Sequence, residues 1–187
     1  MNHILKCSHI DIYYMINSKP NNKNYHQGNY TPVNKDKILK LNSEDGVYYR
    51  SGLELKFMTW LDRSDKIKRW GSECLKIPYQ LTHYEKNGDI NLKSHIYYPD
   101  YYYEIDNNGI FKKVVVEVKP MKEYEDVILL EKKMFKIPKD VTIKKLNSLE
   151  YRLKMAQKNL RKWESMIKFC DLKGFDFIVI TENHFKS

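Results

Sequence analysis

The sequence YYPDYYYEIDNNGIFKKVVVEVKP, residues 97–120, decides the fold class. It holds two runs rich in Tyr, Ile and Val, which are residues favoured in strands, joined at residues 106–109 by the turn sequence DNNG. The consecutive valines from Val114 to Val116 are typical of a buried strand. The stretch therefore predicts two neighbouring strands at the centre of a sheet.

The segments around these strands predict a mixed α/β domain. Residues 51–61 carry apolar side chains at helical spacing, and Ser51 with Glu54 has the S-x-x-E form of a capping box. Residues 148–172 repeat apolar side chains every three or four positions up to Gly174, which predicts the longest helix. Composition and turn signals predict four further elements: extended segments over residues 73–84, a hairpin turn at 86–89, a short helix near 125–135 and a buried strand at 175–181.

Composition divides the chain near residue 48. Residues 1–47 are rich in Asn, Lys, Pro and Ser with little apolar periodicity, so we expect an N-terminal arm and extended loop there. Residues 48–187 are predicted to form one domain, since 42% of the 187 residues are hydrophobic and 13% are aromatic. No stretch approaches the roughly 18 consecutive apolar residues that cross a bilayer, and no secretory signal pattern is visible. We therefore expect a soluble, unexported protein with reduced cysteines and no membrane partner.

The charge balance favours a polyanionic partner. The 33 Lys and Arg residues exceed the 24 Asp and Glu residues by nine, and a surplus of this size attracts nucleic acid. A lysine-rich surface that serves only solubility is the alternative. The outer side of the long helix carries a basic stripe that could contact DNA phosphates, although a solvated helix face explains it equally well. This basic stripe comprises Lys154, Lys158, Arg161, Lys162 and Lys168.

Acidic and basic side chains at the ends of the two central strands are the candidates for chemistry. Glu117 and Lys119 lie two positions apart, so they project to the same face of their strand, whereas Val118 points into the core. A hairpin would bring Asp100 beside Glu117, and the repulsion between two close carboxylates is relieved by a divalent cation such as Mg²⁺. A metal held there with Lys119 suits phosphodiester hydrolysis, and Glu54 is a candidate for a further ligand, direct or through water.

Each candidate also has a plain structural interpretation. Glu54 could serve only the capping box, and Asp100 could be an ordinary turn aspartate after Pro99. A Glu-x-Lys pair on a strand is commonly a solvated ion pair. The combination of all of them is what indicates a metal-dependent hydrolase. The sequence holds no Gly-rich phosphate loop, which excludes ATP hydrolysis by that route, and the scattered His and Cys residues disfavour a zinc site.

Pro99-Asp100 followed by Glu117-Val118-Lys119, with Glu54 on the preceding helix, resembles the PD-(D/E)XK nuclease superfamily. The resemblance implies a restriction-endonuclease-like αβββαβ core, with a mixed central sheet flanked by helices. It also implies a site that binds Mg²⁺ or Mn²⁺ through Asp100, Glu117 and Glu54, with Lys119 as the catalytic lysine.

The pieces W-G-S-E at residues 70–73, I-P-Y at 77–79 and E-V-K-P at 117–120 resemble more specifically the head-completion nucleases of T-even-type tailed phages. That resemblance implies a Mg²⁺-dependent endonuclease that cuts double-stranded DNA at the portal or neck after packaging. Its implied partners are phage portal and neck proteins, and its implied locations are the host cytoplasm during assembly and the virion neck. Two alternatives stay open: a non-cleaving neck plug or DNA clamp, and a transposase or restriction-type endonuclease outside virion assembly.

Overall fold

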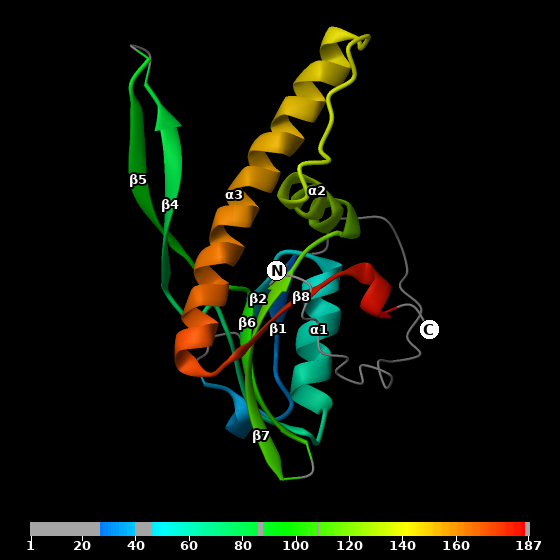
Figure 1. Ribbon diagram of the computed structural model, residues 1–187. Helices are drawn as coiled ribbons and strands as arrows, with labels where there is room; N and C mark the ends of the chain where they lie inside the picture. Colours follow the sequence, from blue (N-terminus) through cyan, green and yellow to red (C-terminus); the bar gives the residue numbers. More distant parts are fainter. Residues whose placement is uncertain (1–26, 40–45, 86–87, 108, 186–187) are drawn as a thin grey trace.

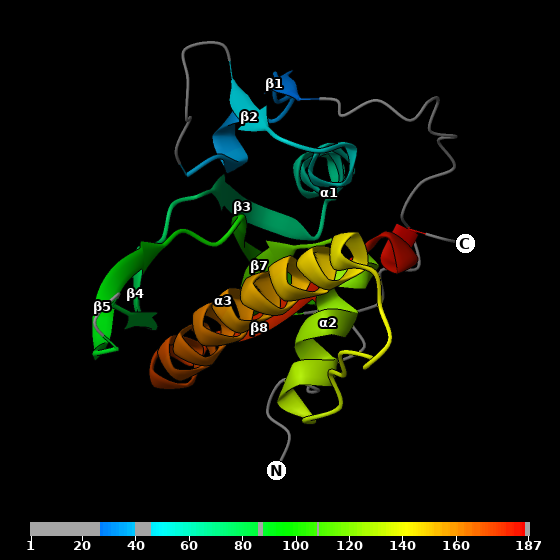
Figure 2. The ribbon, with the colours of Figure 1, turned by 90° about the horizontal axis from the view of Figure 1, so that it is seen from above.

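A four-stranded sheet with helices on both faces forms the centre of the molecule (Figures 1 and 2). The computed structural model describes residues 27–39, 46–85, 88–107 and 109–185. Helix α1 (Gly52–Arg63) covers one face of the sheet, and helices α2 (Met121–Glu131) and α3 (Ile143–Lys173) cover the other. The strand order is β3 (Ile67–Ser72), β6 (Tyr101–Asn107), β7 (Ile110–Val118) and β8 (Asp176–Ile180).

The sheet is mixed, as the sequence predicted. Strands β3, β6 and β7 pair antiparallel, whereas β7 and β8 pair in parallel after the crossover through α3. Helix α1, the three antiparallel strands, helix α3 and strand β8 reproduce the expected αβββαβ order. The restriction-endonuclease-like α/β fold class is therefore confirmed. Strands β4 (Ile77–Tyr84) and β5 (Ile90–Tyr97) are inserted between β3 and β6 as a separate two-stranded hairpin.

Alternation along β7 explains why both of its faces are buried. Val114, Val116 and Val118 pack toward α1 with Phe57 and Leu61. Val115 points to the opposite face and packs with Met166 and Cys170 of α3. Because side chains of a strand alternate between faces, Glu117 continues the face of Val115 and therefore lies on the α3 side of the sheet. Tyr101, Tyr102 and Tyr103 are buried in the same way, which makes them core residues.

Part of the predicted N-terminal arm packs against the domain. Strand β1 (Gly28–Tyr30) pairs with β2 (Val47–Tyr49), and the short 3-10 helix η2 (Lys35–Lys37) lies between them in the chain. The buried carboxylate of Asp62 on α1 accepts hydrogen bonds from the Tyr30 hydroxyl at 2.6 Å and from the Val33 and Asn34 amides at 2.8 and 3.0 Å. The expectation of a loop without core contacts is wrong for residues 28–39, because this buried acid, which composition does not reveal, holds them. Residues 1–26 lie outside the described ranges.

Replacement of Asp62 by Ala should therefore release this segment. The variant loses three hydrogen bonds to a buried charge, and we expect the free energy of unfolding to fall by about 3 kcal/mol. Limited proteolysis should then cut within residues 28–39 at protease concentrations that leave the wild-type chain intact. Asp65→Ala is the matched control, since Asp65 is exposed three positions further along. Equal protease resistance of both variants would show that Asp62 does not hold the segment.

Four parts of the chain differ from their sequence-based predictions. Strand β3 was not predicted, because its register shifts between Ile67 and Arg69 and its apolar alternation is broken. The Tyr- and Ile-rich run before the DNNG turn is divided between two strands, because the chain leaves the hairpin at Tyr97 and enters the central sheet at Tyr101, after Pro99. Helices α2 and α3 both begin earlier than expected. The final elements, β8 and the 3-10 helix η3 (Glu182–Phe185), follow the left-handed Gly174 (φ +67°) that ends α3, as predicted.

None of the helices in the described part of the chain combines the length and apolar character that a bilayer span requires. Cys170 on α3 is buried, and its thiol is not part of a disulfide. Burial raises the pKa of the Cys170 thiol to about 12, which makes it a poor nucleophile.

Candidate active site

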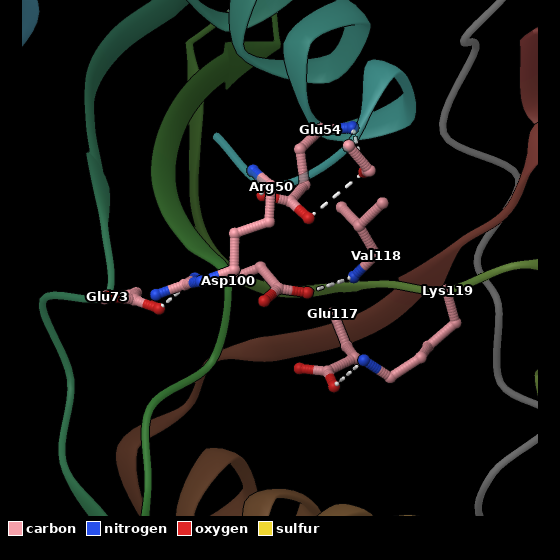
Figure 3. A network of polar contacts seen from close by, with 8 residues as sticks. Arg50, Glu54, Glu73, Asp100, Glu117, Val118 and Lys119 are labelled. Carbon is pink, nitrogen blue, oxygen red and sulfur yellow. Dashed lines mark hydrogen bonds and ion pairs between the residues drawn. The ribbon is translucent and has the colours of Figure 1, made fainter. Parts of the chain in front are cut away.

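Asp100 and Glu117 converge where β6 begins and β7 ends (Figure 3). The strand register pairs Tyr101 with Val116, so one step further along the chain at each end brings Asp100 beside Glu117. The Asp100 carboxylate also accepts a 2.6 Å hydrogen bond from the Val118 amide. The two carboxylates are therefore close enough for the charge of Glu117 to act on Asp100.

Each oxygen of the Glu117 carboxylate has a partner. The Lys119 ammonium lies 2.9 Å from Oε1, and the hydroxyl of the buried Tyr97 donates to Oε2. Glu117 itself is 1% exposed, so this charge is held inside the protein by one cation and one hydroxyl. Lys119 does lie on the same face as Glu117, as alternation predicted. The contact of Tyr97, at the end of β5, was not predicted, because nothing local distinguishes this residue from the other tyrosines around it.

Asp100 and Glu117 are two like charges that water solvates poorly, and this shifts the pKa values of the groups around them. Burial raises the pKa of Asp100 well above its usual value, and the charge of Glu117 raises it further. The Lys119 ammonium and the Val118 amide oppose this rise only in part. Burial alone would lower the pKa of Lys119, but the carboxylates of Glu117 and Asp100 outweigh it and leave that pKa raised. The Lys119 side chain is thus a charged ammonium group beside two carboxylates that repel each other.

Glu54 borders this pair from the opposite layer. Its backbone amide donates to the Ser51 hydroxyl at 3.1 Å, and its carboxylate accepts from the Arg50 amide at 2.9 Å and the Ser51 hydroxyl at 3.1 Å. The predicted capping box is confirmed. Among the residues that the structure describes, no three His, Cys, Asp or Glu side chains converge into a metal-binding group. Glu54 comes from α1, across the sheet from Glu117, so its part in metal binding stays a prediction.

An ion pair beside Asp100 was also missed. The Arg50 guanidinium lies 2.6 Å from the Glu73 carboxylate, and the Glu73 amide donates to the Asp100 carbonyl at 3.1 Å (Figure 3). The hydrogen bond to Glu73 raises the pKa of Arg50. Glu73 adopts a left-handed backbone (φ +49°), which is uncommon for a residue with a side chain and clusters at functional sites. Glu73 of the W-G-S-E piece therefore fixes the loop that carries Asp100.

One member of the basic stripe reaches the acidic pair. The Lys162 ammonium lies 4.8 Å from the centre of the Tyr97 ring, and Tyr97 in turn contacts Glu117. Burial lowers the pKa of Lys162. The positive charges of Lys119 and Lys158 lower this pKa further, whereas the carboxylates of Glu117 and Asp100 oppose the change. The other four residues of the stripe, Lys154, Lys158, Arg161 and Lys168, are exposed on α3. Their contact with DNA stays a prediction.

A family model described as "TnsA-like endonuclease N terminal" matches residues 64–182 of the chain. The chain belongs to this family. TnsA-like endonuclease domains are a PD-(D/E)XK-type nuclease family, so the resemblance seen in the sequence is confirmed. The matched range contains Asp100, Glu117 and Lys119, whereas Glu54 lies before it.

A curated relative of the TnsA-like chain is the head completion nuclease of Enterobacteria phage T4. The two are 25% identical over 158 residues, which cover 84% of this chain and 92% of the phage protein. No solved structure matches the chain significantly. The family and this relative together support a nuclease role for the chain.

Proposed function

We propose that the chain is a divalent-metal-dependent endonuclease that hydrolyses phosphodiester bonds in double-stranded DNA. The observation that carries the proposal is the pair of neighbouring carboxylates, Asp100 and Glu117, with the Lys119 ammonium 2.9 Å from Glu117. Burial of two like charges side by side costs stability, and such arrangements concentrate at functional sites. Membership of an endonuclease family supports phosphodiester hydrolysis as the reaction that these carboxylates serve.

The donor set fits Mg²⁺ or Mn²⁺. These hard cations prefer oxygen ligands, and Mg²⁺ is usually bound through one or two carboxylates with several waters. Asp100 and Glu117 supply two carboxylates, and their mutual repulsion would be relieved by a divalent cation. Glu54, at the start of α1, is proposed as an outer ligand through water. When bound, the cation would lower the pKa of water and offset negative charge on the phosphate.

The protein groups then have separate roles. Asp100 and Glu117 hold the cation, while Tyr97 and Lys119 fix the orientation of the Glu117 carboxylate. The Lys119 ammonium, being charged, offers hydrogen bonds to a phosphate oxygen as negative charge develops on it, which is where preorganised donors contribute most to catalysis. Lys162 adds a second positive charge on the α3 side, so double-stranded DNA would meet two cations at the site.

The biological setting is proposed from the phage relative. Because the similarity spans 92% of the head completion nuclease of T4, we propose that this chain also acts in phage head completion, at the portal or neck after DNA packaging. Portal and neck proteins would be its partners, in the host cytoplasm during assembly and in the virion neck. A transposase-type endonuclease is the second candidate, favoured by the family that the chain belongs to. A non-cleaving plug or clamp is disfavoured, since such a role has no need for the buried acidic pair.

Metal-dependent cleavage of plasmid DNA tests the proposal. We expect purified protein to nick or linearise supercoiled DNA with Mg²⁺ or Mn²⁺ and to lose this activity when EDTA removes the cation. The measurement is the conversion of supercoiled into open and linear forms on a gel. Readdition of Mg²⁺ should restore cutting. Tight DNA binding without cleavage under any divalent cation would instead identify a clamp.

A further inference from the structure

The β4–β5 hairpin extends beyond the central sheet beside α3. Both ribbon views place it along α3, on the side away from α2 (Figures 1 and 2). Its base is anchored, because Ile77, Tyr79 and Tyr97 pack with Met166 and Cys170 of α3. Beyond this base, the side chains of β5 from Ile90 to Ile96 are all exposed. The hairpin is thus a fixed projection rather than part of the core.

A groove of about 560 Å³ lies between the hairpin and α3. The hairpin contributes hydroxyl and amide side chains to the groove, and α3 contributes two cations and a hydroxyl. These polar residues are Gln80, Thr82, Ser94, Arg161, Ser165 and Lys168. One acid, Glu164, also lines the groove, and its charge is matched by Arg161 at 2.9 Å. The net charge of the groove is therefore positive. On the facing wall, Pro78, Tyr79 and Leu92 stand beside the neutral hydrogen-bonding groups.

The groove continues into the candidate active site along two elements. On α3, Arg161 in the groove adjoins Lys162, which lies over Tyr97. On β5, Ser94 in the groove precedes Tyr97 by three residues, which is about 10 Å along a strand. One strand of B-DNA advances about 3.4 Å along the helix axis per nucleotide, so the groove begins a few nucleotides from Glu117.

We propose that this groove holds the phosphate backbone of one DNA strand, a few nucleotides to one side of the bond that is cut. The inference rests on the proposed function and adds the hairpin as a second wall of the DNA site, facing the basic stripe of α3. Cations and side-chain hydroxyl or amide groups together are what phosphate contacts use, because they neutralise the charge and donate to its oxygens. An apolar partner segment would leave the side chains of Gln80, Thr82 and Ser94 without hydrogen-bond partners.

Charge introduced on the hairpin wall tests this inference. Ser94 and Gln80 are direct cross-strand partners, so Ser94→Glu and Gln80→Glu place a negative charge at one point of the groove from either strand. We expect each to weaken binding of a duplex oligonucleotide about tenfold, because a like charge would face the phosphates. Lys168→Ala should reduce the magnitude of the slope of log affinity against log salt concentration by about 1, which corresponds to the loss of one phosphate contact. Binding is measured by fluorescence anisotropy in EDTA, so that cleavage does not interfere.

Asn91→Glu is the matched control, since Asn91 is exposed on the same strand outside the groove and the change in net charge is identical. Weaker binding of the two groove variants, with Asn91→Glu at wild-type affinity, supports the inference. Equal affinities for all three variants overturn it, and if the wild-type chain still cuts plasmid DNA with Mg²⁺, the proposed function stands. A wild-type chain that neither binds nor cuts DNA overturns the proposed function itself, and the groove inference with it.

Discussion

Lys119→Ala is expected to abolish DNA cleavage while leaving the protein folded. The side chain is the cation nearest to Glu117, at 2.9 Å, and its pKa is raised, so it remains charged at neutral pH. Loss of a positioned charged donor in such a site costs about 10²- to 10⁴-fold in rate. The measurement is the rate of plasmid nicking with Mg²⁺, with a urea unfolding curve recorded on the same preparation.

Lys122→Ala provides the control for Lys119. Lys122 lies three positions further along, on the exposed side of α2, so its removal changes the net charge equally without touching the acidic pair. We expect wild-type cleavage from this variant. Comparable losses in both would assign the effect to weaker general attraction of DNA. Full activity of Lys119→Ala would remove Lys119 from the catalytic site.

Asp100→Asn is expected to lose DNA cleavage without losing stability. Cleavage should fall by at least about 10²-fold, because the variant removes one of two carboxylates that would hold the metal and charge stabilisation is a large part of catalysis. The free energy of unfolding should stay within about 2 kcal/mol of the wild-type value and not decrease. An amide oxygen still accepts the hydrogen bond from Val118, and the repulsion with Glu117 disappears.

Thermal and urea unfolding, together with the nicking assay, check this prediction. Asp65→Asn serves as the control, since Asp65 is exposed in the turn between α1 and β3. A loss of several kcal/mol with cleavage intact would make Asp100 a structural residue that caps the start of β6. Increased stability with lost cleavage would show that the acidic pair costs stability and is retained for its chemistry.

Much of the fold was predictable because local patterns and tertiary packing agree. The valine run of β7 and the long amphipathic α3 were read correctly, since burial repeats with the period of each element. Strand β3 was not predicted, because its register shift interrupts the alternation of apolar and polar residues on which such a prediction depends. The segment 28–39 was also misjudged, since one buried carboxylate, Asp62, holds polar residues that look unstructured by composition.

Local patterns along the chain identify the residues that could form a site: a Pro-Asp pair, and a Glu and a Lys two positions apart on a strand. Alternation along one strand is a local rule, so it placed Glu117 and Lys119 on one face without knowledge of the fold. The groups that surround these residues are set by the packing of distant segments. The register of β6 against β7 places Asp100 beside Glu117, and the packing of the hairpin and α3 brings Tyr97 and Lys162 to the same place. Contacts between residues distant in the chain depend on register and layer packing, and no local pattern specifies those.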